Sequence, residues 1–265
     1  MGIPIAIFLG ILQGLTEFLP VSSSGHLVIA QQLYPGALPH ALAFDVCLHF
    51  GTLIAVVIYF REDLFGMARA VFSGPRATEP HLQRWVGMLA VATIPIVIIG
   101  GTLHYQLEQA FTSLTAVGFA LLVTASLLML ARGLSGGSLA PEGLTVRDAI
   151  AIGCFQALAV VPGISRSGAT IVGCLSRNLA PDAAARFAFL LSLPAITGAL
   201  VLNISAVGEL LSQDLTPVLA GMASAAITGF LAIDVMMKAV RLGRLTPFAV
   251  YCAILGAVTL LMGLV

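Results

Sequence analysis

Residues 160–170, VVPGISRSGAT, place an arginine between two serines inside an apolar run. An arginine keeps its proton, so Arg166 in such a segment needs an anionic partner or a wet cavity. Free N–H groups at a helix start, together with hydroxyls and a guanidinium, favour phosphate. The segment therefore predicts a phosphate-binding site, with an Arg166–Glu17 ion pair that only holds the fold as the alternative. The groups expected to bind the anion are Arg166, Gly163, Ser165, Ser167, Gly168 and Thr170.

A second polar segment, QGLTEFLPVSSSGH, covers residues 13–26. Gln13 and Glu17 are one helical turn apart and share a face. A buried carboxylate there could hold a divalent metal with Gln13, or act as an acid or base. Three serines follow, and a helix cap is the ordinary role of such residues. His26 changes that expectation, because a serine needs a nearby base to attack phosphorus.

Two further polar residues lie in the next apolar stretch. Asp45 and His49 are four residues apart and share a helical face. They could line the entrance of a site or extend a metal site, and a structural hydrogen bond is the alternative. Asp234 and Lys238 have the same spacing and predict an ordinary ion pair.

The composition shows which kind of element must position these residues. Apolar residues make up 59% of the 265 and charged residues only 9%, which indicates an integral membrane protein. Lys and Arg (12) balance Asp and Glu (12), so no basic face for nucleic acid is expected. Six stretches are long and apolar enough to span a bilayer as helices: 41–60, 84–102, 114–131, 183–203, 216–236 and 247–265.

Two other apolar regions, 3–33 and 148–177, are interrupted by Pro, Gly and Ser. Broken segments are tolerated at membrane depth only when they are buried in protein or line a wet cavity. Each is predicted to be a re-entrant hairpin of two half-helices. Together with the spans, they define an all-α polytopic membrane protein.

Lys and Arg set the expected orientation. The stretches 61–84, 132–147 and 238–244 contain them, whereas the intervening loops 103–113 and 204–215 contain none. The basic loops are therefore predicted to be cytoplasmic, and the two hairpins to enter from opposite faces.

An internal repeat links the two polar segments. At a separation of 143 residues, positions 6–25 share eight identities with the second copy, among them Gln13 with Gln156 and Ser22 with Ser165. Each half, about 1–131 and 144–265, holds one hairpin and three spans, and an odd number of spans inverts the second half. Inverted repeats with broken helices place a polar site where the halves meet. Ser23 corresponds to Arg166 and should face the same cavity, which makes it the first choice among the three serines; whether Ser23 or a water attacks is left open.

Both segments resemble the signature motifs of the undecaprenyl-diphosphate phosphatase family, also called bacitracin-resistance proteins. Gln13 and Glu17 fit its (E/Q)xxxE pattern, and residues 162–170 fit PGxSRSxxT. The segment 44–60 is similar to the family's following span, and the resemblance covers essentially the whole chain. Gln13 stands where a glutamate would give a second carboxylate. Membrane phosphatases of the phosphatidic-acid type match less well, because their lysine-led KxxxxxxRP motif is absent.

The resemblance implies hydrolysis of the terminal phosphate of a polyprenyl diphosphate at the outer, periplasmic side of the bacterial cytoplasmic membrane. The carrier lipid is thereby recycled for cell-wall synthesis, and bacitracin resistance follows. It also implies dependence on Mg²⁺ or Ca²⁺ at Glu17 and Gln13. The expected catalytic residues are Glu17, Ser23, His26 and Arg166; the expected substrate-binding residues are Ser22, Ser24, Gly163, Ser165, Ser167 and Thr170. Membrane lipid is an expected partner, and a homodimer is left open.

Two other functions compete with this hypothesis. A transporter or flippase of a lipid phosphate could use the same midplane site, but it would have little need for the Ser and His beside Glu17. A structural membrane subunit without a site would leave Arg166 and Glu17 unexplained.

Overall fold

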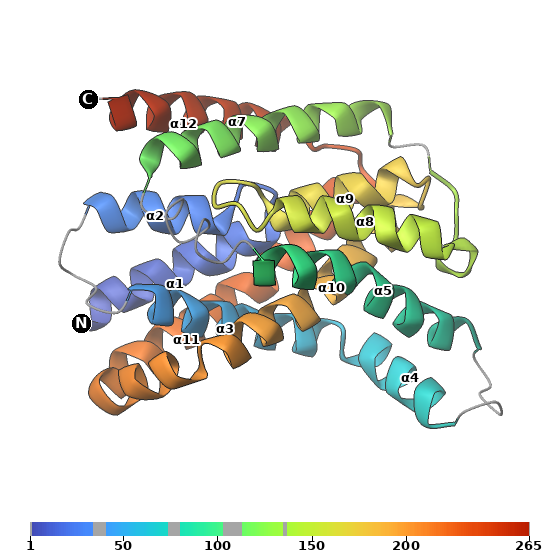
Figure 1. Ribbon diagram of the computed structural model, residues 1–265, viewed down its shortest axis with the longest axis horizontal. Helices are drawn as coiled ribbons and strands as arrows, with labels where there is room; N and C mark the ends of the chain where they lie inside the picture. The colour runs from blue at the N-terminus through green and yellow to red at the C-terminus, as the bar shows by residue number, and fades with distance from the viewer. Residues whose placement is uncertain (1, 34–40, 74–79, 103–112, 135–136, 265) are drawn as a thin grey trace.

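The computed structural model describes residues 2–33, 41–73, 80–102, 113–134 and 137–264. Regular structure in these residues is helical apart from one isolated bridge between Leu139 and Leu179. The α-helices are α1 (Ile3–Phe18), α2 (Ser23–Leu33), α3 (Ala41–Tyr59), α4 (Arg61–Phe72), α5 (Pro80–Thr102), α7 (Leu114–Leu130), α8 (Val146–Leu158), α9 (Arg166–Ser176), α10 (Pro181–Leu202), α11 (Ile204–Arg241) and α12 (Thr246–Leu264) (Figure 1).

Six helices are long and apolar enough to cross a bilayer, and they coincide with the six predicted spans. They are Ala41–Tyr59, Leu82–Thr102, Leu114–Gly133, Pro181–Leu202, Ile204–Arg241 and Thr246–Leu264. About twenty apolar residues in helical form match the thickness of the hydrocarbon core. The chain is therefore a multi-pass membrane protein.

Two segments predicted as loops contain helix. The stretch 61–83 begins with α4, and the stretch 204–215 forms the start of α11. Charged residues such as Asp63 and Glu209 interrupt the apolar pattern there, although they do not prevent a helix. Inside α11, Asp214 has non-helical dihedral angles and Pro217 follows three residues later, so this helix has two parts joined by a kink.

The two broken regions form pairs of short helices, as predicted. Between α1 and α2 the chain turns at Pro20 and at Ser22, whose φ is 70°. Between α8 and α9 it turns at Pro162 and at Gly163, whose φ of 99° favours glycine. Figure 1 shows that α1 and α2 both run between one end of the molecule and its middle, whereas α8 and α9 both run between the opposite end and the middle.

The segment between α1 and α2, called the first connection, touches the segment between α8 and α9, called the second connection. The Ser167 hydroxyl donates to the Leu19 carbonyl at 3.3 Å, and the Gly163 N–H donates to the Ser24 hydroxyl at 3.4 Å. Both contacts cross from one broken pair to the other. The polar residues of the two pairs are thereby held together.

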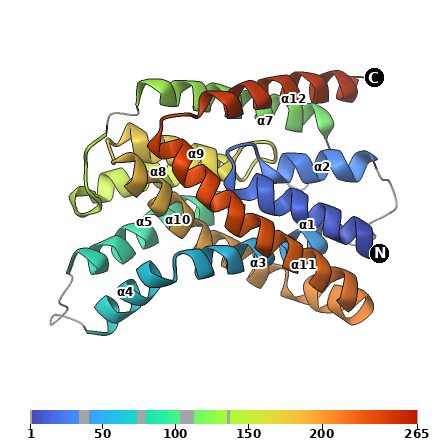
Figure 2. The same ribbon diagram turned by 180° about the vertical axis from the view of Figure 1, so that it is seen from behind.

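Helices from the first half of the chain pack mainly on helices from the second half. α1 and α3 lie along α11, α7 lies along α12, and α5 lies against α8 (Figure 2). Glycines allow the closest of these approaches: a Cβ on Gly10 would overlap the Gly221 carbonyl, and one on Gly14 would overlap the Thr228 hydroxyl. The two halves thus form one interlocked bundle.

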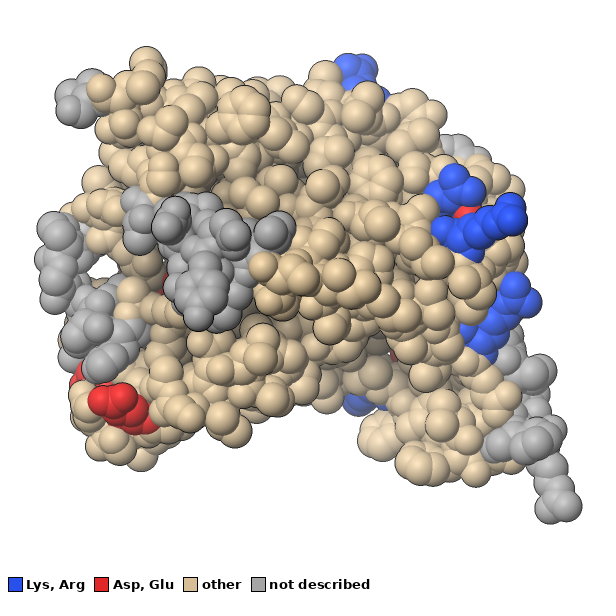
Figure 3. Space-filling view, in the orientation of Figure 1, with Lys and Arg blue, Asp and Glu red and all other residues tan. Residues whose placement is uncertain are grey.

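Exposed basic side chains gather at one end of the bundle, around the α4 end (Figure 3). Two ion pairs at this end cross between helices: Arg186 of α10 contacts Asp63 of α4 at 3.1 Å, and Arg241 of α11 donates to Asp182 of α10 at 2.6 Å. The predicted pair of Asp234 and Lys238 is also present, at 2.6 Å.

Candidate active site

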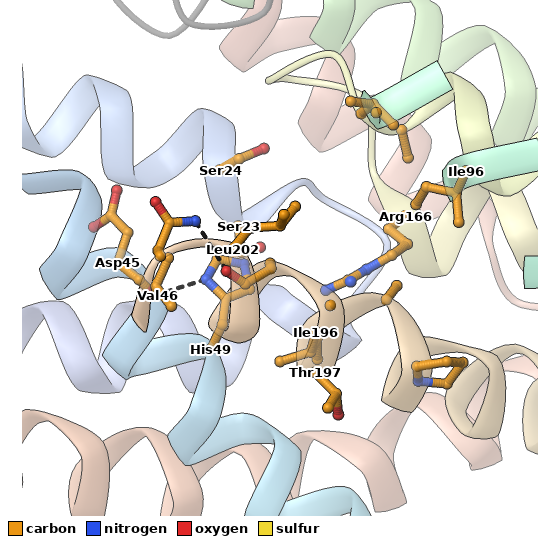
Figure 4. A pocket seen from close by; sticks show the side chains of 18 of the residues that line it. Ser23, Ser24, Asp45, Val46, His49, Ile96, Arg166, Ile196, Thr197 and Leu202 are labelled. Atoms are coloured by element: carbon orange, nitrogen blue, oxygen red, sulfur yellow. Dashed lines mark hydrogen bonds between the residues drawn. The ribbon is translucent and has the colours of Figure 1, made fainter. Parts of the chain in front are cut away.

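A cavity of about 690 Å³ lies beside the meeting point of the two connections. Its lining combines one polar group of residues with apolar walls from α3, α5 and α10. Figure 4 shows polar side chains from several helices directed into it. The polar and charged residues at its wall include Glu17, Ser23, Ser24, Asp45, His49, Ser165 and Arg166.

Glu17 is the centre of the polar group. Its side chain is 4% exposed and lies near the end of α1. One carboxylate oxygen, Oε2, accepts a hydrogen bond from the Ser23 hydroxyl at 2.5 Å and from the Gln13 amide at 3.0 Å. The His49 Nε2 lies 3.4 Å from the same oxygen. A buried carboxylate needs such partners, because an unpaired charge in the bundle would be costly.

Arg166 supplies the opposite charge. Its guanidinium forms an ion pair with Oε1 of Glu17. The contact that the alternative hypothesis required is therefore present. Arg166 nevertheless lies at the cavity wall, with 19% of its side chain exposed, and extends between Ile96 and Ile196 toward Ser23 (Figure 4). An anion in the cavity can reach this guanidinium.

The three neighbouring serines have different surroundings. The Ser22 hydroxyl accepts from the Gly25 N–H at 3.3 Å and caps α2. The Ser23 hydroxyl contacts Glu17, and both Ser23 and Ser24 line the cavity. Only Ser23 therefore combines cavity access with a carboxylate that can accept its proton.

His26 is directed elsewhere. Its Nδ1 lies 2.7 Å from the Ser22 carbonyl and its Nε2 lies 2.7 Å from the hydroxyl of Tyr251 on α12. His26 is also absent from the cavity lining. Neither ring nitrogen is placed to take a proton from Ser23, in contrast to the sequence expectation.

The second connection is fixed by its own hydrogen bonds. Ser165 caps α9 by accepting from the Gly168 N–H at 3.1 Å. Thr124 of α7 receives the Ser165 N–H at 3.0 Å and donates to the Gly163 carbonyl at 2.9 Å. Of the residues expected to bind phosphate on this side, Ser165 and Arg166 line the cavity. The neighbouring residues Gly163, Ser167, Gly168 and Thr170 are not among its lining residues.

Two residues that hold this geometry had not been singled out from the sequence. Thr124 and Tyr251 each lie in an apolar span, where a polar side chain is a signal for a buried partner. Neither has a neighbour in the sequence that reveals the partner. Asp45 and His49 both line the cavity, which agrees with the prediction that they lie at a site. Asp45 also accepts from Gln31 at 2.9 Å.

The site offers few ligands for a metal. The described residues contain no cluster of three or more His, Cys, Asp or Glu side chains suited to a metal ion. Beside Ser23 and Arg166, the hard oxygens are the Glu17 carboxylate and Oε1 of Gln13, which is not a lining residue and is buried without a hydrogen-bond partner among the described residues. The Asp45 carboxylate also lines the cavity, where it accepts from Gln31. One carboxylate with an amide oxygen suits Mg²⁺ when substrate phosphates and water complete the coordination.

The fold and the site define a polytopic membrane protein whose central cavity brings a buried acid, a hydroxyl and an arginine together. Residues 6–258 match the family described as bacitracin resistance protein BacA, and the chain belongs to that family. A curated relative from Desulfosudis oleivorans, named undecaprenyl-diphosphatase, is 45% identical over 97% of each chain. Relatives of the same name from Carboxydothermus hydrogenoformans (97% of this chain, 96% of the relative) and Methanobrevibacter smithii (96% and 95%) are 39% and 38% identical.

Proposed function

We propose that the chain hydrolyses undecaprenyl diphosphate to undecaprenyl phosphate and inorganic phosphate in the central cavity. The name shared by its relatives supports this substrate. The observation that carries the proposal is the cluster of Ser23, Glu17 and Arg166, in which a hydroxyl, a proton acceptor and a fixed cation lie on one cavity wall. A transporter finds no such support in the relatives' names.

The terminal phosphate would replace Glu17 as the partner of Arg166. A guanidinium can hold two phosphate oxygens at once, and Ser24 and Ser165 line the same cavity. Arg166 would then stabilise the charge that builds up on the transferred phosphoryl group. Ser22, Gly163 and Ser167 would support the site by fixing the two connections. The Thr170 hydroxyl is buried without a hydrogen-bond partner among the described residues, so no contact gives it this role.

Ser23 is the proposed nucleophile. Its Oγ attacks the terminal phosphorus while its proton passes to Oε2 of Glu17, 2.5 Å away. The bond between the terminal phosphorus and the bridging oxygen breaks, and undecaprenyl phosphate leaves. Water then attacks the phosphoserine, releases inorganic phosphate and restores the hydroxyl. In the alternative, water attacks the substrate directly and Ser23 only orients Glu17.

His26 would position these groups instead of exchanging protons with Ser23. Its contacts with the Ser22 carbonyl and the Tyr251 hydroxyl tie the first connection to α12. The proton role expected for His26 thus passes to Glu17, with His49 as the neighbouring imidazole.

A divalent cation, Mg²⁺ or Ca²⁺, would be held by Glu17 and Gln13. When bound, it would supply positive charge that offsets the phosphate oxygens.

The site is proposed to open to the periplasmic side of the bacterial inner membrane. The cavity is lined by residues of α5 and α10 near their C-terminal ends, remote from the loops that carry Lys and Arg. Because basic loops favour the cytoplasm, this arrangement supports an outward cavity. The opposite directions of the two broken pairs in Figure 1 likewise support re-entrant hairpins within an inverted repeat.

The first test measures phosphate release from undecaprenyl diphosphate by purified protein in detergent, with and without a chelator. Wild type is compared with Glu17→Gln, and with Glu209→Gln as the control, because Glu209 lies at an exposed position of α11. Release that needs the cation and is lost only in Glu17→Gln is expected. No release by well-folded wild type would refute the proposal, and release by Glu17→Gln at the wild-type rate would remove Glu17 from its centre.

A further inference from the structure

The central cavity has a second, apolar part that the phosphate chemistry does not use. Beyond Arg166, its wall is formed by α5 and by α10, which contributes residues 194–199, Val201 and Leu202. Figure 4 shows Ile96 of α5 on one side of Arg166 and Ile196 of α10 on the other. The cavity therefore continues from the polar cluster into a passage between these two helices.

This passage reaches the outside of the bundle through an apolar rim. Val97 is 65% exposed, Val201 60% and Leu202 82%. All three line the cavity. In a multi-pass membrane protein, exposed apolar side chains on a span face lipid, so the rim offers a route from the polar cluster to lipid tails.

Three glycines leave the passage open. A Cβ on Gly100, Gly101 or Gly198 would meet nothing within 4 Å, and all three line the cavity. Gly10 and Gly14 differ, because a Cβ there would overlap α11. Glycine inside a helix is less favourable than alanine by about 1 kcal/mol. At Gly100, Gly101 and Gly198 no close helix packing offsets this cost. The absence of a side chain there leaves the passage wide.

Prolines lie just before both open stretches. Pro95 in α5 and Pro194 in α10 cannot donate the helical hydrogen bond that another residue would make. The two helices are therefore weakened where the passage begins.

We propose that the prenyl chain of the substrate runs from the phosphate site through this passage, between α5 and α10 and across Gly100, Gly101 and Gly198. The passage would select long-chain lipid diphosphates over short ones. The inference rests on the proposed function, because a lipid diphosphate with its head at Arg166 must lead its tail to lipid. The apolar wall that flanks Arg166 is formed by these two helices.

The test fills the passage at its two sides. Gly101→Leu and Gly198→Leu add a branched side chain at positions where a Cβ meets no atom within 4 Å. Gly87→Leu is the matched control, because it lies on α5, also has nothing within 4 Å of its Cβ, and does not line the cavity. The measured quantity is the ratio of kcat/KM for undecaprenyl diphosphate to that for dimethylallyl diphosphate, which has only one prenyl unit.

The ratio should fall by about tenfold or more in both passage variants and stay at the wild-type value in Gly87→Leu. Gly101→Ala, which adds a single methyl group, should give a smaller fall in the same direction. An unchanged ratio in both leucine variants would overturn the passage, whether activity is kept or lost for both substrates alike. Wild type that hydrolyses neither substrate would instead refute the proposed function, and the passage with it.

Discussion

The two broken helix pairs share a plan but differ in how their polar groups are satisfied. Gln13 in α1 and Gln156 in α8 are both fully buried. Four residues after Gln13, Glu17 accepts its amide hydrogen bond; four residues after Gln156 the chain has Val160, and neither amide atom of Gln156 has a partner among the described residues. The comparison teaches that the shared residues give the two pairs a common plan, whereas the acid, the attacking hydroxyl and the cation, Glu17, Ser23 and Arg166, lie where the pairs differ.

The difference also links the pairs energetically. The first pair alone would bury the negative charge of Glu17, and the second alone would bring the positive charge of Arg166 to the same depth. Breaking such a pair typically costs about 3–5 kcal/mol, because one charge is left uncompensated. Docking of the two connections is therefore favoured by the same contact that assembles the site.

The largest effect should come from removing the cation of the second pair. Arg166→Ala should lower kcat/KM by about 10³–10⁵, as loss of an arginine does in phosphoryl transfer. Phosphate release from undecaprenyl diphosphate measures this. Arg177→Ala is the control, because Arg177 donates to Asp148 at 2.6 Å beyond the other end of α9 and does not line the cavity.

Arg166→Lys separates chemistry from folding, since lysine preserves the charge beside Glu17 but lacks the planar fork. It should unfold near the wild-type temperature and remain far less active. Near-normal turnover by Arg166→Ala would show that the ion pair serves only the fold.

The next effect concerns the hydroxyl of the first pair. Ser23→Ala should lower turnover by about 10²–10⁴, the usual contribution of a positioned proton transfer. Ser24→Ala, which removes the neighbouring cavity hydroxyl, should have a smaller effect. Reactions quenched during turnover should contain phosphoserine at residue 23, detected by mass spectrometry. Undiminished turnover by Ser23→Ala would assign the attack to water.

The smallest effect comes from the two glutamines and tests the comparison itself. Gln156→Met removes a buried amide without partners and should raise stability by about 1–3 kcal/mol with little change in turnover. Gln13→Met removes a partner of Glu17 and should lower turnover about 10- to 100-fold. Thermal unfolding in detergent and phosphate release measure the two. If Gln13→Met and Gln156→Met change stability and turnover by similar amounts, the two glutamines have equivalent roles and the described difference between the pairs is wrong.

Much of the fold could be predicted, because apolar runs of about twenty residues have few alternatives in a membrane. The span predicted at 41–60 is the helix Ala41–Tyr59, and the Pro and Gly clusters mark both helix breaks. α4 and the start of α11 were missed, since their charged residues resemble those of loops while their backbones remain helical. Periodicity alone does not distinguish these cases.

The site was predictable where it depends on the repeat and not where it depends on distant helices. Ser23 was predicted to face the cavity because it occupies the position of Arg166 in the other copy of the repeat. In the structure, both side chains contact Glu17. The direction of His26 depends on Tyr251, which lies 225 residues away in the sequence. The support from Thr124 is also long-range. Local spacing contains no information on either contact.

The packing of α1 on α11 has a consequence for synthesis. α1 ends at Phe18 and α11 begins at Ile204, so the first helix emerges long before its main neighbour. At about 5–20 residues per second, the delay is on the order of 10–40 s. During this interval a nascent chain carries Glu17 without Arg166 for much of the time. The site therefore lacks its cation until Arg166 has been made, and α1 lacks its main neighbour until α11 has been made.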